Sequence, residues 1–269
     1  MLETRHIALD ELPALQQLRP ITLEEMDSVK LLNRIDTKFL TDEQTLVGIL
    51  QDAVAAGYRA LVTEGSKIAG YDTIYFDTPG LRMFLDHHNR RLVRQKVRTR
   101  VYVASGLCFL EIKRKNNHGR TKKKRTGIPL ADFKDFRGNP DACGYLAGHS
   151  DFTADGVSPS LETIFRRITL VNPAMTERLT IDSCLGFRNL RNGAESSLRN
   201  GVVIELKQDG RVESPMRGIL LAHRVKPIRV SKYCIGVTLT DHVVKSGRFK
   251  VKIRQIEKQI NNKITTDLC

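Results

Sequence analysis

Arginine and lysine side chains stand at alternate positions in several short segments of this sequence, an arrangement that suits the binding of anions. Arg98 and Arg100 alternate with Val and Thr in one segment, and Glu111 and Lys113 alternate with apolar residues in a second. Successive side chains of a β-strand point to opposite faces, so each set shares one face of its strand. Facing cations are costly when they are desolvated without partners, so such a lining indicates an anionic ligand.

The same alternation recurs in four further segments, each with apolar residues on one side and charged residues on the other. They are NRIDTKFL (33–40), ERLTID (177–182), VVIELK (202–207) and IRVSKY (228–233). Strands of this kind can share a core only if their sheet closes on itself or two sheets face each other. This leaves a charged interior, which is interrupted by the carboxylates Asp36, Glu111, Asp182 and Glu205.

A charged interior of this composition fits a linear polyphosphate or a nucleoside triphosphate. The guanidinium group matches phosphate oxygens bidentately, and Mg²⁺ or Mn²⁺ is usually held by one or two carboxylates together with substrate phosphates. Phosphoryl transfer needs this equipment, because its catalysis consists largely of positioning and charge neutralisation. The sequence has no glycine-rich phosphate loop, no dinucleotide-binding glycine pattern and no H-E-x-x-H or G-x-S-x-G motif, so nothing indicates those mechanisms.

Net charge is concentrated in one stretch of the chain. Between Arg90 and Arg125 there are fourteen basic residues and a single acid, so this stretch carries +13 of the total of +14. A run this basic could be a disordered arm that binds nucleic acid. Its strand-like alternation favours a folded lining instead, and the absence of Trp argues against base stacking. A non-catalytic polyanion-binding module, for polyphosphate or RNA, stays an alternative.

Composition excludes several classes of protein. The chain has 269 residues and is 41% hydrophobic, which is typical of a globular protein and not of a disordered polycation. No apolar run reaches the ~20 residues of a membrane span, and the first residues lack the apolar core of a secretory signal. We therefore expect a cytoplasmic protein, peripheral at a membrane at most. Five cysteines without a C-x-x-C pair predict free thiols rather than a disulfide or zinc framework.

The sequence has no repeat, low-complexity tract or linker that would divide it, which predicts a single α+β domain over residues 1–269. Its core lies at about 20–240, and a basic C-terminal extension lies at 245–269. We expect about eight strands with helices packed outside, either in a sheet that closes on itself or in two sheets that face each other. Thr22 and Glu25 have the spacing of a capping box, and Ser158-Pro159 predicts a helix start. In the extension, isoleucines at helical spacing indicate a helix that docks on its own domain. Contact with a membrane or a partner is the alternative.

The segments in their order resemble the polyphosphate-polymerase domain of the vacuolar transporter chaperone (VTC) family, a branch of the triphosphate tunnel metalloenzymes. The resemblance covers roughly residues 20–240. It rests on RIDTKF, YDTIYFDT, VRTRVYV, FLEIKRK, TKKKR, ERLTID, VVIELK and RVSKYCIG. It implies a closed antiparallel β-barrel tunnel of about eight strands. In this tunnel the γ-phosphate of ATP would be transferred to inorganic polyphosphate with Mn²⁺ or Mg²⁺. A membrane-protein partner is possible, and no specific nucleic acid is expected.

The resemblance also implies roles for individual residues. The catalytic cations would be Lys38, Arg98, Arg100, Lys113 and Arg178. Further phosphate-binding groups would be Lys124 by strand parity or else Lys122, with Lys207, Arg229, Ser231 and Lys232. Glu205 would hold the metal, with Glu111 and Asp36 as further candidate ligands. Lys232 directly follows Ser231, so in a continuing strand its side chain would point to the opposite face. It reaches the tunnel only if the strand ends and a helix begins at this point.

One departure bears on the direction of transfer. The hydrolytic branch of the superfamily resembles E-x-E-x-K at the first strand, and this sequence has Arg34, Asp36 and Lys38 there. Losing one acid weakens a water-activating hydrolase interpretation and favours the polymerase. A triphosphatase or polyphosphatase in the same tunnel stays the alternative. Thr176 stands where the family usually has Tyr, and Arg229 where it usually has Lys.

Overall fold

The computed structural model describes residues 7–27, 34–262 and 264. One antiparallel path of eight strands forms the body of an eleven-stranded sheet. In spatial order the path is β2 (Arg34–Asp42), β11 (Gly201–Asp209), β9 (Glu177–Asn189), β8 (Ser158–Val171), β4 (Ala69–Asp77), β5 (Arg94–Tyr102), β6 (Leu107–Lys115) and β7 (Thr121–Gly127). The short strands β1 (Arg19–Ile21), β3 (Arg59–Leu61) and β10 (Glu195–Ser197) attach beside β8 and β9.

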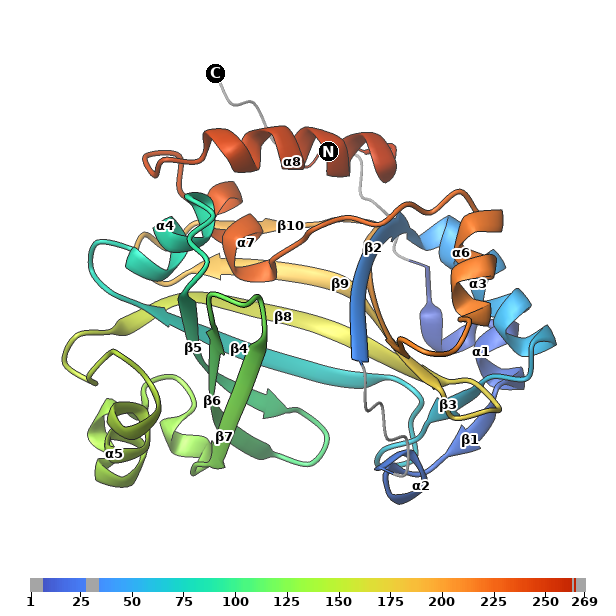
Figure 1. Cartoon of the computed structure of the whole chain (residues 1–269), viewed down its shortest axis with the longest axis horizontal. Helices are drawn as coiled ribbons and strands as arrows, with labels where there is room; N and C mark the ends of the chain where they lie inside the picture. The colour runs from blue at the N-terminus through green and yellow to red at the C-terminus, as the bar shows by residue number, and fades with distance from the viewer. Residues whose placement is uncertain (1–6, 28–33, 263, 265–269) are drawn as a thin grey trace.

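The sheet curls into a half-barrel, so the predicted α+β class and antiparallel curled sheet are confirmed (Figure 1). Its first and last strands, β2 and β7, form no ladder with each other in the described part of the chain. The free edge of β2 instead meets the segment that follows α6 (Pro215–Ala222): the Ile228 N–H donates to the Lys38 carbonyl at 2.8 Å. The closed barrel therefore stays a prediction.

Helices cover both faces of the sheet. They are α1 (Pro13–Gln17), α2 (Leu23–Asp27), α3 (Glu43–Ala55), α4 (Arg82–His88), α5 (Pro140–His149), α6 (Pro215–Ala222), α7 (Lys232–Thr240) and α8 (Gly247–Gln259). On the outer face, α1, α3 and α6 bury one apolar cluster and α5 buries a second. On the inner face, α4, α7 and α8 bury a third at one end of the curl. Figure 1 shows α5 and α8 on opposite sides of the sheet.

Local sequence signals set the helix starts. The Thr22 N–H donates to Glu25 Oε2 at 2.8 Å and the Glu25 N–H donates to Thr22 Oγ1 at 3.2 Å, which confirms the predicted capping box. Asp42 caps α3 by accepting from the Thr45 N–H at 2.7 Å. Ser214 caps α6 in the same way. These caps fix where each helix leaves the sheet.

The helix predicted after Ser158-Pro159 is wrong, because residues 158–171 form the long strand β8. Leu161 and Phe165 point inward and are fully buried, whereas Ile164 on the outer face is 53% exposed. Farther along, Ile168 on that outer face is covered by helices. Helices therefore cover the outer face of β8 only in its second half. The buried apolar residues lie on the inner face in the first half and on both faces in the second, and together they recur at a spacing typical of a helix.

The C-terminal extension docks on its own domain, as expected. Ile253, Ile256, Ile260 and Ile264 are all buried in the cluster on the inner face. This burial anchors α8 over one end of the half-barrel. No helix of the described residues is long and apolar enough to cross a membrane.

Candidate active site

The register of the sheet brings most of the predicted site residues to its inner face. Lys38 on β2 lies opposite Glu205 on β11. The next inward pair is Asp36 and Lys207, and Lys207 also lies opposite Arg178 on β9. Period-two alternation therefore holds across three neighbouring strands, and cations outnumber carboxylates on this part of the face.

On the other half of the sheet, Arg98 lies opposite Glu111 and Lys113 lies opposite Lys123. The expected parity of β7 is thus wrong. Lys122 and Lys124 pair with Arg114 and Ile112 and are exposed on the outer face. The turn at 116–119 pairs residue 115 with residue 121, so the odd-numbered positions of β7 point inward.

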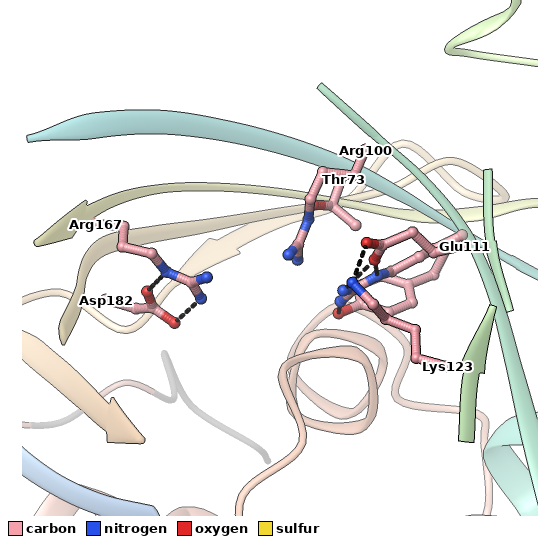
Figure 2. A network of polar contacts seen from close by, with 8 residues as sticks. Thr73, Arg100, Glu111, Lys123, Arg167 and Asp182 are labelled. Carbon is pink, nitrogen blue, oxygen red and sulfur yellow. Dashed lines mark hydrogen bonds and ion pairs between the residues drawn. The ribbon is translucent and has the colours of Figure 1, made fainter. Parts of the chain in front are cut away.

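Glu111 forms the centre of one buried network. Arg98 Nε donates to its Oε2 at 2.7 Å. Lys123 Nζ donates to its Oε1 at 2.8 Å (Figure 2). Burial alone would raise the pKa of Glu111, but Arg98, Arg100 and Lys123 outweigh burial and hold the pKa well below its usual range. Both carboxylate oxygens of Glu111 are therefore occupied by donors.

A second network joins Arg167, Asp182 and Lys232. The Arg167 guanidinium binds Asp182 bidentately, Nε to Oδ1 at 2.6 Å and Nη2 to Oδ2 at 2.8 Å (Figure 2), and Lys232 Nζ also donates to Oδ2. Arg167 lies over the ring of Tyr71, with its Cζ 4.8 Å from the centroid. Burial, opposed by Asp182 and assisted by Arg167, lowers the pKa of Lys232 to about 8.

The position of Lys232 follows from the start of α7. Ser231 is the N-cap and accepts from the Cys234 N–H at 3.3 Å. A helix therefore does begin at Lys232, and this turns its side chain inward as the condition in the sequence required. Lys96 Nζ also donates to Ser231 Oγ, at 2.7 Å. The helix N-terminus and two lysines thus gather at one point of the inner face.

Glu205 is held differently from the other two carboxylates. It forms no ion pair with any residue that the structure describes. Burial raises the pKa of Glu205, but Lys38, Lys207 and Lys113 outweigh this effect and lower it to about 2. Lys113 itself lies close to Arg98, and this repulsion together with burial lowers its pKa well below the usual range. The site thus combines an ionised carboxylate with three nearby lysines, none of which forms an ion pair with a described residue.

The sequence comparison that decides the family is a model of the VTC domain, which matches residues 33–240. The chain belongs to the VTC domain family. The resemblance to this family that was drawn from the sequence segments is confirmed. Among curated proteins, none matches this sequence.

Two solved structures are similar to this VTC domain. A candidate adenylate cyclase from Bacillus halodurans aligns with a TM-score of 0.50 and 13% identity, over 81% of this chain and 99% of its own. At this identity the similarity concerns the fold alone. A Hippeastrum protein described as a candidate adenylyl cyclase with a dominant triphosphatase activity aligns with a TM-score of 0.47 and 15% identity, over 76% of this chain and 95% of its own.

The VTC domain offers one carboxylate that fits a divalent metal ion. No group of three or more His, Cys, Asp or Glu residues comes together among the described residues. Glu111 is occupied by Arg98 and Lys123, and Asp36 pairs with Arg34 at 2.7 Å where both are partly exposed. Glu205 forms no ion pair with a described residue and lies near Lys38, Lys113 and Lys207. A single carboxylate of this kind fits an ion that is bound mainly through the phosphate groups of a ligand. We retain Glu205 alone as the candidate ligand.

Besides Lys123, sequence reasoning missed two further inward-facing residues of the VTC domain. Arg167 was missed because the sequence of its strand predicts a helix. Lys96 lies two residues before Arg98, so it shares the inward face predicted for Arg98, but it is part of no recognised motif. Arg229, in contrast, is exposed beside the inner face rather than within it. Strand parity alone indicates Lys96, whereas Arg167 needs the register of β8 against β9.

Proposed function

We propose that this VTC domain transfers the γ-phosphate of ATP onto an inorganic polyphosphate chain with the help of Mn²⁺ or Mg²⁺. The observation that supports the proposal is the composition of the inner face. Its carboxylates Glu111 and Asp182 are neutralised by arginine and lysine, and a surplus of half-buried lysines surrounds Glu205. An arrangement of half-buried like charges becomes favourable once a phosphate chain lies among them.

The chain's own residues would act by orientation and by charge neutralisation. A terminal phosphate oxygen of the acceptor chain attacks the γ-phosphorus, one P–O bond forms, the bond to the β-phosphate oxygen breaks, and ADP leaves. The attacking oxygen is already ionised at neutral pH, so no side-chain base is required. Lys38, Lys113 and Lys232 hold the equatorial and leaving oxygens. A metal ion at Glu205 would supply further neutralisation of phosphate charge.

A shortage of acidic residues at the start of the first strand favours transfer to phosphate over transfer to water. Among residues 34, 36 and 38 the one acid is Asp36, which pairs with Arg34 and lies across the ladder from Lys207. A hydrolase that activates water between two metal ions needs more free carboxylates than this. A triphosphatase or polyphosphatase in the same half-barrel is the second candidate, because phosphate binding is common to both.

Product analysis tests the proposal. Purified protein incubated with ATP and Mn²⁺ should yield ADP and long acid-stable polyphosphate. Orthophosphate without chain products would select the hydrolase. Neither product, together with steeply salt-dependent binding of RNA, would select the non-catalytic polyanion-binding module.

Ligand binding gives an independent test of the site. Tripolyphosphate at a hundred times its Kd should stabilise the fold by about 2.7 kcal/mol. Lys38→Ala or Arg178→Ala should remove this thermal shift, whereas Lys122→Ala on the outer face is the matched control and should keep it. A shift that survives both inner-face variants would overturn the assignment. The cytoplasmic location and the membrane-protein partner stay predictions.

A further inference from the structure

Five cations gather beside the active site at the end of the half-barrel that α8 covers. They are Arg90, Arg94, Lys115, Arg229 and Lys252, and we name them the rim cluster. Arg94 and Lys115 lie opposite each other on β5 and β6. Each is two residues beyond a lysine of the active site, Lys96 or Lys113. That step along a strand is roughly 7 Å, so the rim cluster continues the same row of cations.

Lys252 reaches the rim cluster from α8, which lies outside residues 33–240 of the family match. Its Nζ donates to the backbone carbonyl of Arg229. Phe249, Ile253 and Ile256 of the same helix are buried and fix its position. The lysine is therefore held half-buried at this place instead of extending freely into water.

The cations of the rim cluster repel one another without a counter-charge. Burial, with Arg94 and Arg229, lowers the pKa of Lys115, and burial, with Arg229 and Arg90, lowers that of Lys252. No carboxylate among the described residues forms an ion pair with any of the five. A fold that fixes like charges in this way is relieved by an anion.

His87 lies among the same charges and adds a second observation. Its Nδ1 is buried and has no hydrogen-bond partner among the described residues. Burial together with Lys96, Arg94 and Lys252 lowers its pKa to about 2, so the imidazole is neutral. It therefore adds an unsatisfied polar atom and no further positive charge to this end of the half-barrel.

We infer that the rim cluster binds phosphate groups of a linear polyphosphate that extend beyond the active site, and that Lys252 of α8 is one of its ligands. The inference rests on the proposed function and adds a subsite to it. A continuous row from Lys113 to Lys115 and Lys252 suits a chain of evenly spaced anionic groups. The subsite would make this chain prefer long polyphosphate over tripolyphosphate.

Binding measurements with two ligands test the subsite. Lys252→Ala and Lys115→Ala should each weaken the binding of long-chain polyphosphate roughly threefold to tenfold, and should leave the Kd of tripolyphosphate unchanged. Lys250→Ala and Arg254→Ala remove the same charge from the exposed side of α8 and serve as controls. Lys252→Arg should restore the affinity. Unchanged melting temperatures would confirm that α8 stays docked.

The outcomes separate the two proposals. If Lys252→Ala and Lys250→Ala have equal effects on long-chain affinity, or if the wild-type protein binds both phosphates equally well, the rim subsite is refuted and the proposed function stands. If the wild-type protein does not bind tripolyphosphate at all, the proposed function fails. If single-stranded RNA loses more affinity than polyphosphate in Lys252→Ala, the subsite serves nucleic acid and the inference is wrong.

Discussion

Replacing Glu205 with glutamine should produce three effects that only its assigned position explains. Glutamine resembles the protonated carboxyl group in shape, so Glu205→Gln removes the charge that Lys38, Lys113 and Lys207 surround. The metal-free protein should lose stability. Its affinity for tripolyphosphate without metal should rise, because the ligand no longer meets a negative charge. The gain in tripolyphosphate affinity that Mn²⁺ confers on the wild-type protein should disappear.

The loss of stability can be estimated from the pKa of Glu205. The surroundings lower it from 4.5 to about 2, and one pKa unit corresponds to about 1.4 kcal/mol, which gives about 3 kcal/mol as an upper value. For a chain of this length that is about 6 °C in Tm. Because the folded pKa is the lower one, the contribution is complete above pH 4.5 and is lost as the pH falls toward about 2.

Urea unfolding of both proteins between pH 7 and pH 3 measures the effect, and calorimetric titration of tripolyphosphate with chelator or with Mn²⁺ measures binding. The difference in unfolding free energy should be largest at pH 7 and should narrow below pH 4.5. Glu195→Gln, which removes one partner of an exposed ion pair with Arg188, is the control and should cost less than about 1 kcal/mol. Equal stability at pH 7, or a metal response that persists in Glu205→Gln, would refute the reasoning.

Three further predictions concern other parts of the structure. Lys123→Ala should weaken tripolyphosphate binding about tenfold and Lys122→Ala should not, and titration calorimetry that found the reverse would contradict the register of β7. Gly236→Ala should lower the free energy of unfolding, measured in urea, by about 1–3 kcal/mol. The reason is that a Cβ at this position would lie 2.5 Å from a methyl group of Leu161 in the core. An unchanged urea midpoint would show that α7 can shift to make room. The pKa of Lys232 is lowered to about 8, so the affinity for tripolyphosphate without metal should fall between pH 7 and pH 9. Lys232→Arg should remove most of this fall, because arginine stays charged over this range. A fall of equal size in Lys232→Arg would assign the titration to another group.

Much of the fold could be predicted because charge and hydrophobicity alternate strictly along most strands. Lys38, Glu205, Arg98 and Lys113 all lie on the inner face that parity predicts. That pattern works where one face of a strand is buried under helices along its whole length. It fails at β8, whose outer face is exposed at Ile164 and covered farther on.

The remaining differences arise from non-local registers. Parity within TKKKR favours Lys124 or Lys122 as the inward lysine, whereas the pairing of β7 with β6 places Lys123 inward. Arg167 meets Asp182 only because β8 and β9 pair in one register, interrupted by a bulge at 164–166. Closure of the barrel likewise depends on contacts between the ends of the path, which no short segment of sequence specifies.

The outward lysines of β7 have a consequence for behaviour at high concentration. β7 ends the strand path, and in the described part of the chain it pairs only with β6, so its other edge presents unpaired backbone groups. Such an edge can recruit the same strand of a second molecule, and lysines along it oppose this association. Lys122 and Lys124 therefore need not touch the phosphate chain to matter, since their charge helps to keep the protein from aggregating.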